Sequence, residues 1–144
     1  MSRCRVYKTR SVDNCFNELR EAQITWDIKK FCIIDDCFNL KKGRVLEFAA
    51  KVRPLGLEWI CSNGLRADLF DEEIADSIRA SGCRHLSFGI ETASDRILEM
   101  IQKGETLAQI EKAILMLLQR CLTNHLLRLE AIIMSLCLSD VSNK

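Results

Sequence analysis

The sequence has no long apolar run and no excess of charge of either sign. Its nearest approach to a membrane span, residues 131–138, is far shorter than the ~18 consecutive apolar residues of a transmembrane helix. Lysine and arginine together number 21 and aspartate and glutamate 20, which leaves a net charge of +1. The charge therefore gives no electrostatic reason to expect a nucleic acid or an anionic membrane as partner.

Several familiar catalytic and binding patterns are also missing. The sequence has no Ser-His-Asp arrangement, no phosphate-binding loop and no basic stripe with interleaved aromatic residues. It has a single proline, Pro54, and no low-complexity segment or long linker. Of its two histidines, His125 lies in the C-terminal tail, and His85 is expected at the start of a strand, where a structural role is favoured over catalysis.

The sequence does contain enough apolar material for one folded domain. Its 144 residues are 48% apolar, which is ordinary for a globular protein. Most of the eight cysteines lie in apolar stretches, and the basic N-terminus is not followed by the apolar segment of a signal peptide. We therefore expect a reduced, cytoplasmic protein rather than a secreted disulfide framework.

The stretch FCIIDDCFN, residues 31–39, raises the question of a metal site. Cys32, Asp35, Asp36 and Cys37 could each bind a metal, but side chains alternate between the faces of a strand and cannot all converge on one ion. Zinc sites usually have two closely spaced ligand pairs, and no second pair is present. A buried strand whose polar end faces a cleft is favoured, and we predict no metal site.

Apolar periodicity and capping residues predict alternating helices and strands. Ser11 is a candidate N-cap for a helix over residues 12–24, and Asp71 is one for a helix that Gly82 closes. Further helices are expected over 43–52, over 94–102 and from Leu107 onward, and strands over 31–34, 57–61 and 86–90.

This alternation is typical of an α/β fold in which crossover helices join parallel strands. Three strands cannot close a barrel, so the sequence fits either a barrel from which strands are missing or a small open sheet. Polar residues follow each predicted strand, where the ends of parallel strands form one rim. Each polar end alone is better explained as a helix cap or a solvated loop, but together they predict a polar-ligand site. The residues are Asp35, Asp36 and Asn39; Ser62, Asn63, Arg66 and Asp68; and Glu91, Thr92 and Ser94.

Four stretches, in order, resemble one known family: KTRSVDN, FCIIDDCFN, WICSNGLRADLFDEE and GCRHLSFGIETASDRILEMIQKGET. The set, over residues 7–118, is similar to the core domain of radical S-adenosylmethionine (radical SAM) enzymes, especially the branch with a cobalamin-binding domain upstream. The resemblance implies a partial TIM-type (β/α) barrel, here a fragment with three or four parallel strands and crossover helices. It also implies a four-iron four-sulfur cluster, bound by a Cys-x-x-x-Cys-x-x-Cys loop, that reductively cleaves S-adenosylmethionine.

The same resemblance implies cofactor-binding roles for residues of the rim. Asp35 and Asp36 resemble acceptors for the ammonium group of S-adenosylmethionine and for a ribose or substrate hydroxyl. Asn63 and Arg66 match rim positions after the third strand of the family, and the forked donors of Arg66 suit a carboxylate. Glu91, in GIETAS, resembles the acid that lies near the ribose.

The sequence also departs from the family pattern. Its cysteines, at positions 4, 15, 32, 37, 61, 83, 121 and 137, never have the spacing of the cluster-binding loop, and we expect the chain to begin after that loop. The leading expectation is a fragment of a radical SAM enzyme, inactive as this chain, with an unknown substrate and with cobalamin bound only by an upstream domain. The alternatives are a non-catalytic module that binds a small ligand or a partner, and an unrelated α/β protein.

Two segments near the C-terminus complete the expectations. Lys103 and Gly104, in QKGET, match a family pattern for which the sequence gives no role. Residues 119–144 diverge from the family and contain no glycine, which fits either a shifted reading frame or gene truncation, or a genuine helix extension. We treat residues 1–144 as a single partial domain whose open sheet edge favours self-association. The helix extension rests on the spacing of Leu126, Leu129, Ile133 and Leu136.

Overall fold

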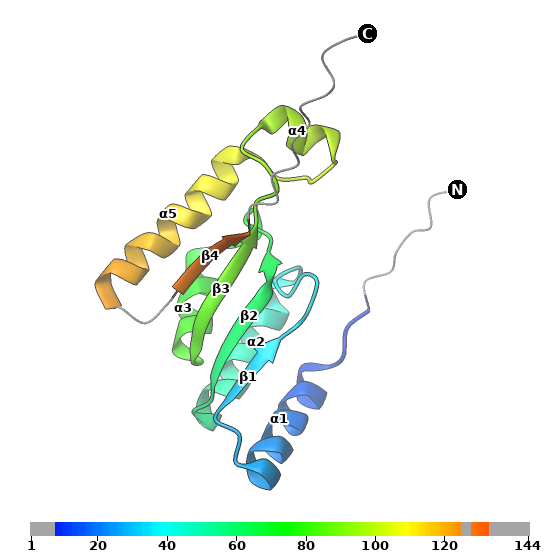
Figure 1. Ribbon diagram of the computed structural model, residues 1–144. Helices are drawn as coiled ribbons and strands as arrows, with labels where there is room; N and C mark the ends of the chain where they lie inside the picture. Colours follow the sequence, from blue (N-terminus) through cyan, green and yellow to red (C-terminus); the bar gives the residue numbers. More distant parts are fainter. Residues whose placement is uncertain (1–7, 125–127, 133–144) are drawn as a thin grey trace.

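A computed structural model describes residues 8–124 and 128–132 of the chain, with side chains up to Gln119 (Figure 1). Helices and strands alternate along the sequence, as its periodicity predicts. In chain order they are α1 (Val12–Trp26), β1 (Lys30–Ile33), α2 (Lys42–Val52), the 3-10 turn η1 (Arg53–Leu55), β2 (Glu58–Leu65), α3 (Glu72–Ala80), β3 (Cys83–Gly89), α4 (Asp95–Met100), α5 (Leu107–Asn124) and β4 (Arg128–Ile132).

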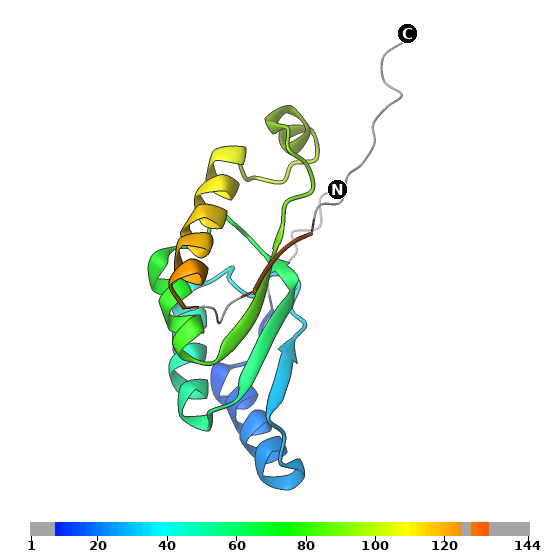
Figure 2. The same ribbon diagram turned by 60° about the vertical axis from the view of Figure 1, so that its left-hand side comes forward.

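The strands form one parallel sheet in the order β1-β2-β3-β4, which confirms the predicted α/β class. Figure 2 shows α2, α3 and α5 on the same face of this sheet. Within the described part of the chain, the opposite face is left uncovered, and it carries the exposed side chains of the paired residues Cys32 and Ile60. All strands point the same way, so the loops after β1, β2 and β3 gather with α4 at one rim (Figure 1).

Local capping explains where two of the helices begin. The hydroxyl oxygen of Ser11 accepts a hydrogen bond from the backbone N–H of Asn14 at the start of α1. The carboxylate of Asp71 accepts one from the N–H of Ile74 at the start of α3. The N–H groups in the first turn of a helix have no acceptor within the helix, and both side chains accept from such a group. Both predicted N-caps are therefore confirmed.

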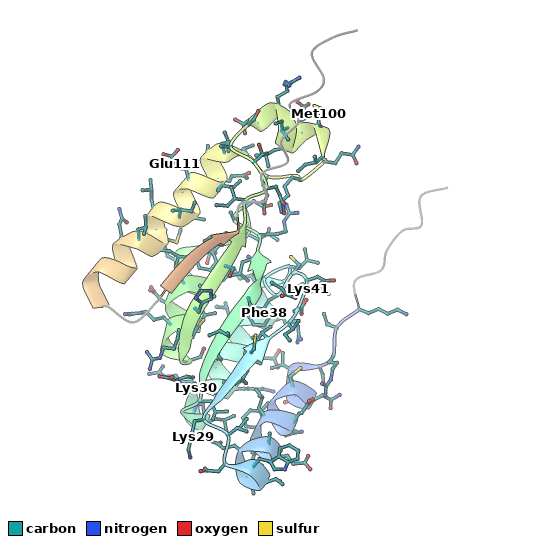
Figure 3. All side chains as sticks on the ribbon, in the orientation of Figure 1. Lys29, Lys30, Phe38, Lys41, Met100 and Glu111 are labelled. Carbon is teal, nitrogen blue, oxygen red and sulfur yellow. The ribbon has the colours of Figure 1, made fainter. Side chains whose placement is uncertain are left out.

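The core lies between the sheet and the helices that cover it. Its centre is Trp59 on β2, which is 1% exposed and stacks on Phe31 of β1 with ring centroids 6.0 Å apart. Phe38 and Phe48 meet the indole edge to face, each at 5.9 Å. Figure 3 shows Phe38 in the loop after β1, so this aromatic cluster reaches the rim and supports the loop that carries the predicted site residues.

Two sequence predictions about element ends are wrong. Strand β2 continues to Leu65 instead of ending at Cys61, so Asn63 lies inside the strand, in a segment where the register with β3 shifts. Beyond α5 the helix does not continue through Leu129, because that residue belongs to β4 and pairs with Leu86 of β3. The other three residues of the predicted helix extension, Leu126, Ile133 and Leu136, lie outside the described residues, as does His125.

Within the described ranges, no helix combines the length and apolar character needed to cross a bilayer.

Candidate functional site

The loop after β1 carries Asp35 and Asp36 at the rim. Both residues line a cavity of about 530 Å³, together with Lys8 and Arg10, which precede α1, and Arg44 of α2. Cavities of this size are within the range that small-molecule ligands occupy. Glu18 of α1, which pairs with Arg10, lines the same cavity. The cavity therefore presents three carboxylates and several cationic side chains to the same volume.

Asp35 also shapes its own loop. Its Oδ1 atom accepts a hydrogen bond from the N–H of Cys37 at 3.1 Å, which leaves Oδ2 to accept from a ligand. Two residues further on, the buried Asn39 pairs with the backbone of Arg66, donating to its carbonyl at 2.7 Å and accepting from its N–H at 3.0 Å. The amide of Asn39 thus connects the loop after β1 to the loop after β2.

Arg66 begins the loop after β2, where its guanidinium group is already hydrogen-bonded. Nε and Nη2 donate to the two carboxylate oxygens of Asp68 at 2.9 and 2.8 Å, a bidentate pair. Nη1 donates to the carbonyl of Lys103 at 3.2 Å and Nη2 to that of Gly104 at 3.1 Å. The forked face that would suit a ligand carboxylate is occupied by Asp68, so the predicted cofactor contact of Arg66 stays a prediction.

Glu91 follows β3 and has an uncommon backbone conformation for a residue with a side chain, with φ at 59°. Its Oε1 atom accepts a hydrogen bond from Nζ of Lys103 at 3.2 Å. Because Lys103 contacts both residues, the structure brings Glu91 and Arg66 to the same side of the rim. Asp35 and Asp36 line a cavity to which neither contributes, and Asn63 is exposed on β2.

Glu105 is a residue of the rim that sequence reasoning missed. Its side chain is 0% exposed, and its Oε1 atom accepts from the N–H of Ala67 at 3.1 Å and lies 3.6 Å from Nε of Arg66. Burial, first, and the neighbouring Asp68 carboxylate raise the pKa of Glu105 to about 7. An acid that follows a glycine in a polar loop looks solvated in sequence, so no local signal points to this burial.

Replacing Glu105 with glutamine should stabilise the protein above neutral pH. The folded state keeps the Glu105 proton up to pH 7, whereas the unfolded chain releases it near the ordinary pKa of 4.5, so stability falls as pH rises between these values. Glutamine keeps the acceptor for Ala67 and never ionises. We expect E105Q to raise the free energy of unfolding by about 1–3 kcal/mol at pH 8 and by little at pH 5.

Urea unfolding at pH 5 and pH 8 measures this difference. Glu111→Gln, on the exposed face of α5, is the matched control, and Figure 3 shows this side chain pointing outward. An E105Q effect of equal size at both pH values would contradict the role of Glu105 ionisation.

The described cysteines do not fit an iron-sulfur cluster. Among the side chains that the structure describes, residues 8–119, no three metal-capable ones gather in a group. Cys61 and Cys83 are each 1% exposed in the core, and this burial raises the pKa of both thiols to about 12. The Sγ atom of Cys32 lies 3.3 Å from the hydroxyl oxygen of Ser62.

Comparison with known proteins gives a consistent result. The family model described as the radical SAM superfamily matches residues 2–129. An uncharacterized methyltransferase of Pyrococcus horikoshii is 34% identical over 69% of this chain and 22% of its own length. An anaerobic magnesium-protoporphyrin IX monomethyl ester cyclase of Rubrivivax gelatinosus is 27% identical over 78% of the chain and 21% of its own length.

A bacteriochlorophyllide d C-12(1)-methyltransferase of Chlorobaculum tepidum is 26% identical over 75% of the chain and 24% of its own length. The chain thus spans about a fifth to a quarter of the length of the curated relatives that it matches.

Proposed function

Because the chain belongs to the radical SAM superfamily, we propose that its rim binds S-adenosylmethionine. The observation that carries this proposal is the cavity at the end of β1. Asp35 and Asp36 lie there with Lys8 and Arg44, so groups of both signs surround one volume. The methionine part of the cofactor is a zwitterion, whose ammonium suits the two aspartates and whose carboxylate suits the cationic side chains.

The other half of the cofactor would lie nearer β3. Glu91 is 28% exposed in its side chain and accepts one hydrogen bond through Oε1, so Oε2 can accept from a ribose hydroxyl. Asn63 and Arg66 complete the proposed set at the end of β2. The backbone N–H of Arg66 is bonded to Asn39, and its guanidinium group is bonded to Asp68. We therefore expect Arg66 to contribute less to cofactor binding than Asp35, Asp36 and Glu91 do.

We further propose that this chain is one part of a radical SAM enzyme and is inactive by itself. In this superfamily the four-iron four-sulfur cluster supplies the electron that cleaves the cofactor, and the described residues do not provide its ligands. The cluster ligands, and any cobalamin, would come from protein outside this chain. A cytoplasmic location is part of the same proposal, supported by the thiols of Cys15, Cys32, Cys61 and Cys83, which form no disulfide.

The names of the relatives support no single substrate. Two are methyltransferases and one is a cyclase, so the proposal for the complete enzyme covers methyl transfer or ring closure and leaves the substrate open. The cofactor-binding step is the part that this chain can test.

Replacing Asp35, Asp36 and Glu91 together with alanine should abolish binding of S-adenosylmethionine. Hydrogen bonds to charged groups contribute about 1.5–3 kcal/mol each, so each single replacement should weaken binding roughly tenfold or more. Isothermal titration calorimetry of the unmodified chain and the variants measures the dissociation constants directly.

The matched control removes three carboxylates elsewhere, with Glu21, Glu47 and Glu111 on α1, α2 and α5 changed to alanine. This control should bind the cofactor as the unmodified chain does. If the rim variant binds equally well, the site is wrong. If the unmodified chain binds no S-adenosylmethionine, the proposal gives way to a non-catalytic module that associates through the uncovered face or the edge strand β1.

A further inference from the structure

The loop between α4 and α5 contains the QKGET pattern, residues 102–106, to which the sequence gives no role. Arg66 donates hydrogen bonds to the carbonyls of Lys103 and Gly104, at 3.2 and 3.1 Å. Glu105 accepts one from the N–H of Ala67 at 3.1 Å. Two hydrogen bonds to backbone carbonyls and one to a side-chain carboxylate therefore hold residues 103–105, the 103–105 loop, against the segment that follows β2.

The side chain of Lys103 leaves the loop in the direction of β3. Its Nζ atom lies 3.2 Å from Oε1 of Glu91, and the two side chains are only 22% and 28% exposed. A Cβ atom on Gly89, the last residue of β3, would lie 3.2 Å from this Nζ and 3.5 Å from this Oε1. The absence of a side chain at Gly89 leaves the space that the ion pair occupies.

The backbone that carries Glu91 is strained. Glu91 has φ at 59°, and the N–H of Thr92 donates to the carbonyl of Ile90 at 2.6 Å, which closes a tight three-residue turn. A residue with a side chain pays about 1–3 kcal/mol for such a conformation, and it persists only where its surroundings hold it. The Glu91 side chain is held by the hydrogen bond that its carboxylate accepts from Lys103.

We propose that Lys103 is a positioning residue, which holds the Glu91 carboxylate at the end of β3 with one oxygen bound and the other free to accept from a ribose hydroxyl. This inference rests on the proposed binding of S-adenosylmethionine. Lys103 itself touches no ligand in this arrangement. It acts through Glu91, and the hydrogen bonds of the 103–105 loop to Arg66 and Ala67 fix the point from which it acts.

Lys103→Ala tests the proposal with two measurements. The first needs no ligand: hydrogen exchange of the Thr92 amide, followed by NMR, should become about five- to tenfold faster when the contact to Glu91 is lost. The second is the affinity for S-adenosylmethionine and for adenosine, which should fall by the same factor as in Glu91→Ala. The double variant should lose no more than either single variant, because both remove one interaction.

Two controls separate positioning from a general loss of charge or stability. Lys103→Arg keeps a cation that can reach Glu91, and it should restore both slow exchange and affinity. Lys51→Ala removes a lysine that pairs with Asp13 and Glu47 on the helical side, and it should change neither. Affinity for methionine, which lacks the ribose, should be unaffected by Lys103→Ala.

The outcomes are separable from those of the proposed function. Unchanged Thr92 exchange in Lys103→Ala overturns the positioning role, whether or not the cofactor binds. Additive losses in the Lys103 and Glu91 double variant also overturn it, because Lys103 would then contact the ligand directly. Failure of the unmodified chain to bind S-adenosylmethionine refutes the proposed function alone, and Thr92 exchange still decides whether Lys103 holds the turn.

Discussion

Replacing Gly82 with alanine is expected to destabilise the protein by about 3–5 kcal/mol, enough to unfold a marginal domain. Gly82 lies between α3 and β3 with φ at 98°, a conformation that side chains rarely adopt. A Cβ atom there would also lie far inside van der Waals contact with the carbonyl oxygen of Leu57. The backbone cannot move away, because the carbonyl of Gly82 accepts a hydrogen bond from the N–H of Trp59 at 3.0 Å.

Two other glycines separate the conformational effect from the steric one. Gly56 has φ at 64° and nothing within 4 Å of a new Cβ, so alanine there should cost about 1–2 kcal/mol. Gly43, in α2, has neither restriction, and alanine should be neutral or stabilising by up to about 1 kcal/mol. The midpoints of urea unfolding rank the stabilities of the three variants, provided that their m-values are equal. A Gly82 variant as stable as the Gly56 variant would refute the close approach to Leu57.

Replacing Trp59 with alanine is the second change with a large expected effect, a loss of about 3–5 kcal/mol of unfolding free energy. The indole is 1% exposed and contacts the rings of Phe31, Phe38 and Phe48, so its removal leaves a cavity in the centre of the core. Its Nε1–H donates to the carbonyl and hydroxyl oxygens of the buried Ser81, at 3.1 and 3.2 Å. These acceptors would lose their donor as well.

The other tryptophan of the chain is the matched control. Trp26, at the end of α1, is 73% exposed, and its replacement by alanine should change stability by about 0.5 kcal/mol or less. Trp59→Phe, which keeps an aromatic ring but loses the indole N–H, should fall between the two. Chemical unfolding followed by circular dichroism gives the three values. Equal costs at Trp26 and Trp59 would contradict the placement of the core.

The parts of the fold that sequence predicts well depend on local interactions. Ser11 and Asp71 act within three residues of their own positions, and the apolar spacing of α2 reflects one helix face against one sheet. The parallel order of the strands follows from helices between them, because such crossovers connect parallel neighbours. These features require no knowledge of what lies far away in the chain.

The parts that sequence predicts poorly depend on distant partners. Ser62, Asn63 and Gly64 have the composition of a turn, yet they form an irregularity inside β2, and the strand pairs with β3 again at Leu65. The guanidinium group of Arg66 suggests, from sequence alone, a contact with a ligand carboxylate. In the structure it donates instead to Asp68 and to the carbonyls of the 103–105 loop. The burial of Glu105 likewise depends on a loop that meets it from 38 residues away.

Each strand of the sheet is hydrogen-bonded to the strand that precedes it in the chain. A β/α unit that emerges from the ribosome therefore meets a sheet edge that has already formed, and it need not wait for a later segment. Each new strand is joined to its neighbour by one connecting segment, so bringing the two strands together costs little loop-closure entropy. We expect the sheet to grow in one direction during translation, from β1 to β4, with each new strand covering the edge left by the one before it.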